Sequence, residues 1–414
     1  MILKETLRAI VRSQRAEFES YDYGVDREKL GSIDVDVPYA TIVSGIRRCG
    51  KSTLMRQVSR SLQSFYYLRF EDIRLAGFEP SDFEKLDDIF LEEYGQSGVY
   101  LLDEVQNVEK WELFVRSRLD RQRRFVITGS NASLLSKELG TRLTGRHINV
   151  ELFPFSFLEA LSFEKKKASA SQFSHYLSSG GFPEYLRYGR VEILNELLND
   201  VIQRDIISRH NVRNSKALKE LAVYLLTNIG KEFSYNGLKE TFGLGSVTTA
   251  SAFVSYFEDA YMIFTIPKFS YSLKEQAVNQ KKVYCVDNGL SAINSASFSS
   301  DNGAKLENMV FMQLRRAYDK IFYFKGNNEC DFIVKERDRV KMAVQATYEL
   351  HEGNKKRELN GLSEAMQKLG LSEGLILTYD QEDNLEVDGR EVKVRPFWKW
   401  AGEAALQRAH ASKV

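Results

Sequence analysis

The residues best suited to chemistry form a complete G-x-x-x-x-G-K-S pattern, Gly45-Ile46-Arg47-Arg48-Cys49-Gly50-Lys51-Ser52, followed by Thr53. This pattern predicts a phosphate-binding loop, because Gly45 and Gly50 allow a backbone turn whose N–H groups converge on phosphate oxygens. Lys51 would reach the β- and γ-phosphates of a nucleotide, and the Ser52 hydroxyl would coordinate Mg²⁺. We therefore expect every residue from Gly45 to Thr53 to contribute to nucleotide binding.

The elements around this loop agree with that interpretation. Tyr39–Val43 is an apolar run rich in β-branched residues, as expected of a buried strand, and Leu54–Val58 continues as a helix. Strand, glycine loop and helix are the context that the motif requires, which favours it over an ordinary glycine-rich turn. Arg47 and Arg48 add positive charge, and they either help to hold phosphates or are solvated or paired elsewhere.

A second apolar run, Val99–Leu102, ends in the carboxylates Asp103 and Glu104. Asp103 is expected to hold Mg²⁺ through water, and Glu104 to orient or deprotonate an attacking water. An apolar run that ends in two acids is a weak signal alone, because strands often end in polar residues. It becomes strong when it follows a complete phosphate-binding loop.

A third apolar run, Phe125–Gly129, ends in Ser130 and Asn131. Ligand sites of parallel sheets lie at the carboxyl ends of strands, so either side chain could contact the γ-phosphate or the attacking water. A helix cap is the alternative role. Arg142 and Arg146 follow, and one of them is a candidate for the arginine that stabilises transition-state charge, from this chain or a neighbouring subunit. A surface position is the alternative for both.

Length and composition narrow the class of protein. The chain has 414 residues, which suggests about three domains. A net charge of +1 argues against a globally basic nucleic-acid binder. The three cysteines contain no CxxC pair, so neither a zinc knuckle nor a disulfide framework is indicated. The absence of a signal-peptide pattern and of an apolar run near 18 residues predicts a cytoplasmic protein without a membrane segment.

These motifs together resemble a family of prokaryotic AAA-type P-loop ATPases. The resemblance is carried by G-I-R-R-C-G-K-S-T, L-L-D-E-V-Q, T-G-S-N-A-S-L-L, L-T-G-R and E-L-F-P-F-S-F, and it extends over nearly the whole chain. It implies an ATPase whose site core is Lys51, Ser52, Asp103 and Glu104. It also implies a polar sensor at Ser130 or Asn131 and an arginine finger at Arg142 or Arg146. Such proteins pair the ATPase core with a C-terminal domain of uncertain role.

The middle of the chain is similar to a lid followed by a winged helix. Gly180–Tyr185 resembles the lid element of signalling-type ATPases, in which a proline touches the nucleotide, so Pro183 is a candidate contact; a plain turn is the alternative. Three helical segments and a β-ribbon then suggest a winged helix-turn-helix. Its third helix, from Val247, contains no Arg or Lys, so we favour an interdomain or protein contact over base readout.

The C-terminal part resembles restriction-endonuclease-like domains of the PD-(D/E)XK type, in which clustered carboxylates hold Mg²⁺ beside a lysine. Glu307 and Asp331 match the first two positions of that site. Gln345 stands in the third, but Thr347 replaces the lysine, and Lys325 or Lys341 would have to reach the site instead. We expect a nuclease-like fold, and we favour the absence of nuclease activity over its presence. Local hydrogen bonding is the alternative role for both acids.

The predicted fold class is α/β: an AAA-type P-loop core on a parallel sheet at residues 1–165, a helical and winged-helix segment at 166–285, and a nuclease-like domain at 286–414. The predicted cofactors are ATP and Mg²⁺. The expected function is ATP hydrolysis that drives the C-terminal domain in nucleic-acid processing, with DNA favoured over RNA. The alternative is a nucleotide-gated switch or scaffold for a protein partner. A homo-oligomer is expected in either case.

Overall fold

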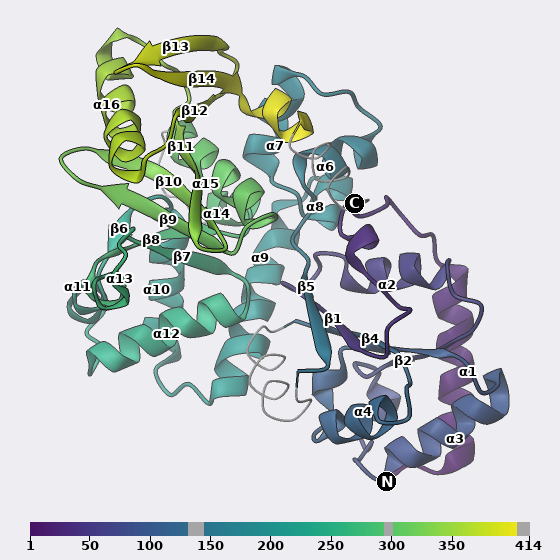
Figure 1. The fold of residues 1–414 in the computed structure, drawn as a ribbon. Coiled ribbons are helices and arrows are strands. Elements are labelled where there is room, and N and C mark those ends of the chain that lie inside the picture. Colours follow the sequence, from purple (N-terminus) through teal and green to yellow (C-terminus); the bar gives the residue numbers. More distant parts are fainter. Residues whose placement is uncertain (131–144, 294–300, 404–414) are drawn as a thin grey trace. The chain divides into compact units, whose positions relative to one another are not determined.

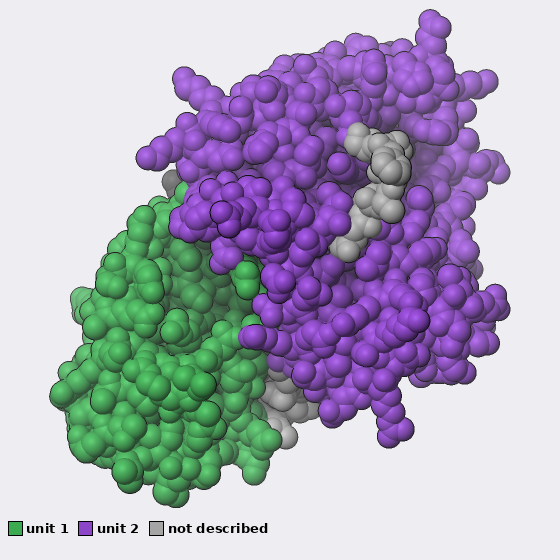
Figure 2. Space-filling model, turned by 180° about the vertical axis from the view of Figure 1, so that it is seen from behind, with its two compact units in different colours: residues 1–153, 259–261 green, residues 154–258, 262–414 purple. Residues whose placement is uncertain are grey.

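The chain divides into two units, unit 1 with residues 1–153 and 259–261 and unit 2 with residues 154–258 and 262–414 (Figure 2). The computed structural model describes residues 1–130, 145–293 and 301–403, and most of its helices and strands are labelled in Figure 1. Among these residues, no helix is both long enough and apolar enough to span a membrane.

Unit 1 is built on a parallel five-stranded sheet with the order β2-β3-β4-β1-β5. The strands are β1 (Ala40–Ser44), β2 (Phe65–Arg69), β3 (Val99–Asp103), β4 (Phe125–Gly129) and β5 (His147–Glu151). β1 to β4 are apolar along their length because helices cover both faces of the sheet, as is usual for parallel sheets. The predicted parallel sheet is therefore present, and β4 lies between the strand before the glycine loop and the strand that ends at Asp103.

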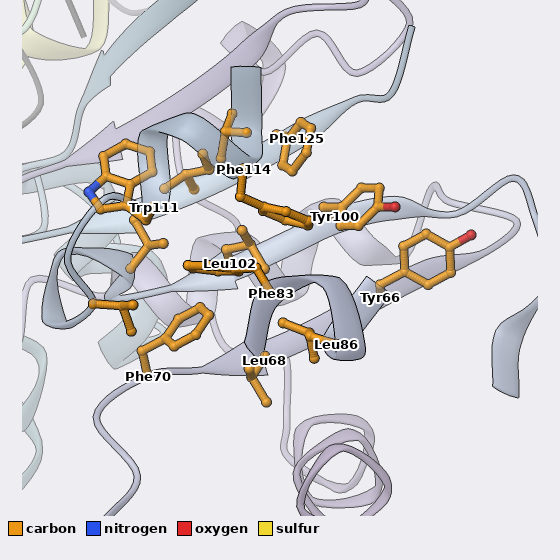
Figure 3. Close-up of a cluster of buried hydrophobic side chains, with 14 of the residues drawn as sticks. Tyr66, Leu68, Phe70, Phe83, Leu86, Tyr100, Leu102, Trp111, Phe114 and Phe125 are labelled. Atoms are coloured by element: carbon orange, nitrogen blue, oxygen red, sulfur yellow. The ribbon is translucent and has the colours of Figure 1, made fainter. Parts of the chain in front are cut away.

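Helices of unit 1 cover the sheet unequally. They are α1 (Lys4–Ser20), α2 (Lys51–Ser59), α3 (Asp82–Tyr94) and α4 (Trp111–Leu119). α1, α3 and α4 share an aromatic core with alternate residues of β2, β3 and β4, in which Tyr66, Phe83, Tyr100, Phe114 and Phe125 are packed (Figure 3). α2 contacts β4 and begins directly at the glycine loop. This packing fixes the carboxyl ends of β1, β3 and β4 next to the start of α2.

Unit 2 begins with helices and a small sheet. The helices are α6 (Phe157–Glu164), α7 (Ala170–Ser179), α8 (Pro183–Tyr188), α9 (Val191–Asp200), a π-helical continuation (Val201–Ser208), α10 (Ser215–Thr227), α11 (Tyr235–Thr241) and α12 (Val247–Asp259). The strands β6 (Glu232–Phe233), β7 (Ile263–Pro267) and β8 (Lys281–Cys285) form an antiparallel sheet in the order β6-β8-β7. A short helix, α13 (Leu273–Val278), lies in the connection between β7 and β8.

The rest of unit 2 is a mixed sheet of six strands in the order β13-β14-β12-β11-β10-β9. The elements are α14 (Asn288–Ala292), α15 (Asn302–Arg315), β9 (Lys320–Lys325), β10 (Glu329–Glu336), β11 (Arg339–Ala346), α16 (Glu352–Leu369), β12 (Glu373–Thr378), β13 (Asp383–Val387) and β14 (Arg390–Pro396). β10 and β11 form a hairpin, since they pair in antiparallel register. A bulge between Cys330 and Ile333 interrupts the β9 register next to Asp331, and such bulges redirect side chains.

Candidate nucleotide-binding site

The glycine loop has the backbone shape that its sequence predicts. Gly45 and Gly50 have φ values of 156° and 102°, and a Cβ at Gly45 would lie 2.0 Å from the Leu152 carbonyl oxygen. A residue outside the loop also stabilises it. The buried Arg27 guanidinium donates to the carbonyl oxygens of Cys49 at 2.7 Å and Phe153 at 2.6 Å. Arg27 was not expected from the sequence, since nothing in its local pattern marks it.

Lys51 opens helix α2 with its ammonium turned back into the loop. The Nζ donates to the carbonyl oxygens of Gly45 at 3.0 Å and Ile46 at 3.2 Å. It also lies 3.5 Å from Oε1 of Glu104. The side chain is buried, so these oxygens compensate a desolvated charge. The loop thus holds a buried cation where the sequence predicts phosphate binding.

Asp103 and Glu104 lie side by side at the end of β3, and burial acts to raise the pKa of each, with different net results. For Asp103, which is fully buried, burial and the charge of Glu104 together keep the pKa above its usual value, although hydrogen bonds from Thr128 and Ser52 oppose the shift. For Glu104, Lys51 and Gln106 outweigh burial and hold the pKa below its usual value. The surroundings of Glu104 therefore favour its ionised form.

Thr128 connects these two acids, and the sequence analysis did not single it out. Its Oγ1 donates to Oδ1 of Asp103 and accepts the backbone N–H of Glu104 at 2.9 Å. Glu104 has a left-handed backbone (φ 53°), which costs free energy in a non-glycine residue and requires such support. The available signal was a lone hydroxyl within the apolar β4.

We expect Thr128→Val to lower the rate of ATP hydrolysis by about 10- to 100-fold, because the carboxylates lose the group that orients them. Unfolding should also become easier by about 1–3 kcal/mol, since the N–H of Glu104 is left unsatisfied. The rate constant and KM for ATP, measured across a Mg²⁺ titration, together with urea unfolding, check both effects. Thr128→Ser retains the hydroxyl and should stay near wild type; a valine variant with an unchanged rate would contradict the assigned role.

The structure brings some of the other predicted residues to this site and places others elsewhere. Ser130 is buried directly after β4, while Asn131 and Arg142 lie outside the described residues. Arg47 pairs with Glu71 at 2.9 Å. Pro183 is the first residue of α8 in unit 2, a position that suits proline because its missing N–H has no helical partner there. Its contact with a nucleotide stays a prediction.

Arg146 lies at the amino ends of the strands, whereas the glycine loop follows the carboxyl end of β1. Its carbonyl oxygen accepts the N–H of Ala40, the first residue of β1, and its guanidinium pairs with Asp120 at 2.6 Å. The loop follows the far end of β1, which is about 13 Å away at strand rise per residue. The sequence left open whether the arginine finger comes from this chain or from a neighbouring subunit. For Arg146, only a neighbouring subunit is compatible with that role, which stays a prediction.

The donors at this site fit Mg²⁺. Ser52 and Asp103 share a hydrogen bond, and one hydroxyl with one carboxylate, completed by water and phosphate oxygens, is a usual Mg²⁺ environment. The described residues contain no group of three or more His, Cys, Asp or Glu side chains that could hold a metal ion. When bound, the ion would neutralise phosphate charge.

Comparison with known proteins decides the family. A model for an AAA domain matches residues 38–161, and two models for domains of unknown function, DUF8612 and DUF4143, match residues 170–300 and 302–400. An uncharacterized protein of Methanocaldococcus jannaschii is 34% identical over 392 residues, which cover 87% of each chain. The chain belongs to the family of this archaeal protein.

Other relatives of this AAA-domain protein are more distant. An uncharacterized protein of Haemophilus influenzae is 28% identical, and the match covers 86% of this chain and 93% of that protein. Among solved structures, the Thermotoga maritima RuvB Holliday junction branch migration motor is 18% identical, with a TM-score of 0.32, over 63% of this chain and 94% of its own. A Pyrococcus horikoshii STAND protein with a tetratricopeptide repeat sensor is 14% identical, with a TM-score of 0.30. The match covers 72% of this chain and 46% of that protein. The predicted AAA-type core is confirmed by the matched AAA domain.

The acids predicted for a nuclease-like site in unit 2 of the AAA-domain protein also meet. Glu307 on α15, Asp331 on β10 and Gln345 on β11 line one pocket of about 500 Å³. The Asp331 N–H donates to the Gln345 amide oxygen at 3.2 Å, and the Ala346 N–H donates to the Asp331 carboxylate at 2.9 Å.

Neither lysine suggested from the sequence is the one that lies among these acids. Lys341 pairs with Glu336 at 2.9 Å, and Lys325 pairs with Glu232. Lys282, on β8, contacts the acids instead. Burial alone would lower the pKa of Lys282, but the neighbouring acidic groups hold it well above its usual value. The cluster therefore contains a lysine whose charged form is favoured, and it comes from β8, which the sequence assigns to the winged-helix segment.

Proposed function

We propose that this AAA-domain protein is a Mg²⁺-dependent ATPase in which Lys51 binds phosphates, Ser52 and Asp103 hold the metal ion, and Glu104 activates water. The observation that carries this proposal is the convergence of a buried ammonium, a hydroxyl and two carboxylates at the ends of β1 and β3. A site of this composition supports binding of a polyanion with its metal ion, followed by attack of a water on phosphorus.

We propose further that α10 to α12 with β6 to β8 form a winged helix, and that the six-stranded sheet with α15 and α16 is nuclease-like. Three helices followed by a β-ribbon, and two carboxylates brought together at the pocket of Glu307, support these assignments. ATP hydrolysis would then act on the C-terminal part of the chain during nucleic-acid processing, with DNA favoured over RNA. An oligomer would supply the arginine finger in trans.

The alternative function is a nucleotide-gated switch that binds a protein partner. Two observations favour it. The third helix, α12, carries no Arg or Lys, although base readout usually depends on such side chains. The connection between β7 and β8 exposes three large apolar side chains, with Tyr271 at 77%, Leu273 at 80% and Val278 at 75% of their surface. Exposed apolar groups in one segment are typical of a protein contact.

Steady-state ATP hydrolysis, measured alone and with single-stranded, duplex and branched DNA or with RNA, distinguishes the two functions. For nucleic-acid processing we expect Lys51-dependent turnover that rises several-fold with one of these nucleic acids. For the switch we expect slow turnover that no nucleic acid changes. Absence of any hydrolysis above the Lys51→Ala background, under conditions where ATP binds, would contradict the ATPase proposal itself.

A further inference from the structure

The Lys282 ammonium lies at the centre of three carboxylates from two different elements. Its Nζ is 3.1 Å from Oε1 of Glu307, 3.2 Å from Oδ1 of Asp331 and 2.7 Å from Oε1 of Glu329. The lysine side chain is only 4% exposed. Glu307 comes from α15 and the other two acids from β10, whereas Lys282 comes from the middle strand of the small sheet.

The three carboxylates surround the ammonium as counter-ions. A lysine ammonium has three N–H donors and no acceptor, and three carboxylates lie within ion-pair distance of it. Two of these donors are engaged by Glu307 and Asp331, and Glu329 is a third counter-ion at 2.7 Å. Lys282 is therefore poorly placed to act as the lysine of a working nuclease site, although it stands among the correct acids.

The same oxygens are the ones that a divalent cation would need. Mg²⁺ is held by carboxylate oxygens at about 2.0–2.1 Å, and the nuclease-like resemblance assigns that task to Glu307 and Asp331. Both carboxylates already face the buried ammonium, and a second cation placed between them would be repelled by it. The residues present therefore do not fit a bound Mg²⁺ while Lys282 is in place.

Neighbouring contacts hold Lys282 where it is. Its strand is paired on both sides, with Glu232 of β6 opposite Lys282 in one register and Ile266 of β7 opposite it in the other. Two residues further along β8, the Tyr284 hydroxyl donates to the same Glu307 oxygen at 2.7 Å. Lys325 at the end of β9 pairs with Glu232. The lysine is thus fixed by the fold and is not a mobile surface side chain.

We propose that Lys282 is a built-in cation that takes the place of the divalent metal ion in this carboxylate site and joins β8 to α15 and β10. The site then neutralises its acids within the chain and binds no Mg²⁺ or Mn²⁺ while the lysine occupies it. This inference does not depend on ATP hydrolysis, and it favours a structural junction over phosphodiester cleavage in unit 2.

Mn²⁺ binding to the nucleotide-free full chain, followed by electron paramagnetic resonance, tests the proposal. Wild type and the matched control Lys281→Met should show no Mn²⁺ binding that depends on Asp331. Lys281 is the preceding residue on β8, and its Nζ instead contacts the Tyr235 hydroxyl at 3.1 Å. Lys282→Met should gain one Mn²⁺ per chain, and Lys282→Met combined with Asp331→Asn should lose it again. Thermal unfolding of Lys282→Met should shift upward with Mn²⁺ by more than that of wild type, and Asp331→Asn should remove this difference.

Three results would overturn the proposal: Mn²⁺ binding by wild type that Asp331→Asn abolishes, metal-dependent DNA cleavage by wild type that Asp331→Asn abolishes, or a folded Lys282→Met chain that gains no Mn²⁺. If the Lys282→Met chain does not fold, the proposal is tested by comparing Mn²⁺ binding by wild type with Mn²⁺ binding by Asp331→Asn. Equal Mn²⁺ binding by these two chains supports the proposal, and a difference between them refutes it.

Discussion

Glu104→Gln should lower the rate constant for ATP hydrolysis by about 100- to 10,000-fold, the range expected when a positioned general base is lost. Glu104 is the carboxylate that Lys51 and Gln106 keep ionised despite its burial, because they hold its pKa below the usual value. A glutamine has the same shape and can still accept the hydrogen bond from Gln106, but it cannot accept a proton from water. ATP affinity should therefore change little while turnover is lost.

Single-turnover hydrolysis and equilibrium ATP binding, measured on the same preparation, check this separation of binding from chemistry. Glu109→Gln is the matched control, because Glu109 is an exposed acid a few residues further along the same segment. It should behave as wild type. A Glu104→Gln chain that retains more than about a tenth of wild-type turnover would refute the role given to Glu104.

Lys51→Met should weaken ATP binding by about 100-fold, which corresponds to about 2.7 kcal/mol. The ammonium is the buried positive charge of the glycine loop, and charge-assisted hydrogen bonds to phosphate oxygens are among the strongest available to a side chain. Methionine keeps the length and apolar stem of lysine but contributes no charge. The variant also leaves Glu104 without its nearest cation, 3.5 Å away in the wild type, so its pKa should rise.

Isothermal titration calorimetry with ATP and Mg²⁺ measures the loss of affinity, and circular dichroism confirms that the variant is folded. Arg60→Met is the matched control, because it removes a cation at the far end of the same helix, where Arg60 pairs with Asp26. We expect its affinity for ATP to equal that of wild type. Equal affinities for Lys51→Met and Arg60→Met would show that the loop cation does not bind phosphate.

The sequence was most informative where one short segment contains the whole chemistry. The glycine loop depends on the φ values of Gly45 and Gly50 and on a lysine at the first helical residue, and all three are fixed by local spacing. The buried strands were recognisable because a parallel sheet covered on both faces requires continuous apolar runs. The carboxylates after β3 followed from the same pattern.

Residues that act through contacts between distant segments were missed. Thr128 became important only because β4 lies between β1 and β3, an order that no local pattern encodes. Arg27 reaches the loop from a connection that shows no motif. Arg146 was a candidate arginine finger for this chain or for a neighbouring subunit, and only strand pairing placed it beside the first residue of β1, at the opposite end of that strand from the glycine loop.

The AAA-type phosphate-binding loop and its paired acids could thus be recognised from the residues alone, since those groups lie within single strand ends and turns. The nuclease-like acids were also found, because each sits in a recognisable helix or strand. The cation that lies between these acids became visible only in the folded chain. Lys282 is 25 residues from Glu307 and 49 from Asp331 along the chain, and its ammonium reaches them because β8 is held against α15 and β10. Cations and carboxylates attract through space, whereas sequence patterns register only neighbours along the backbone.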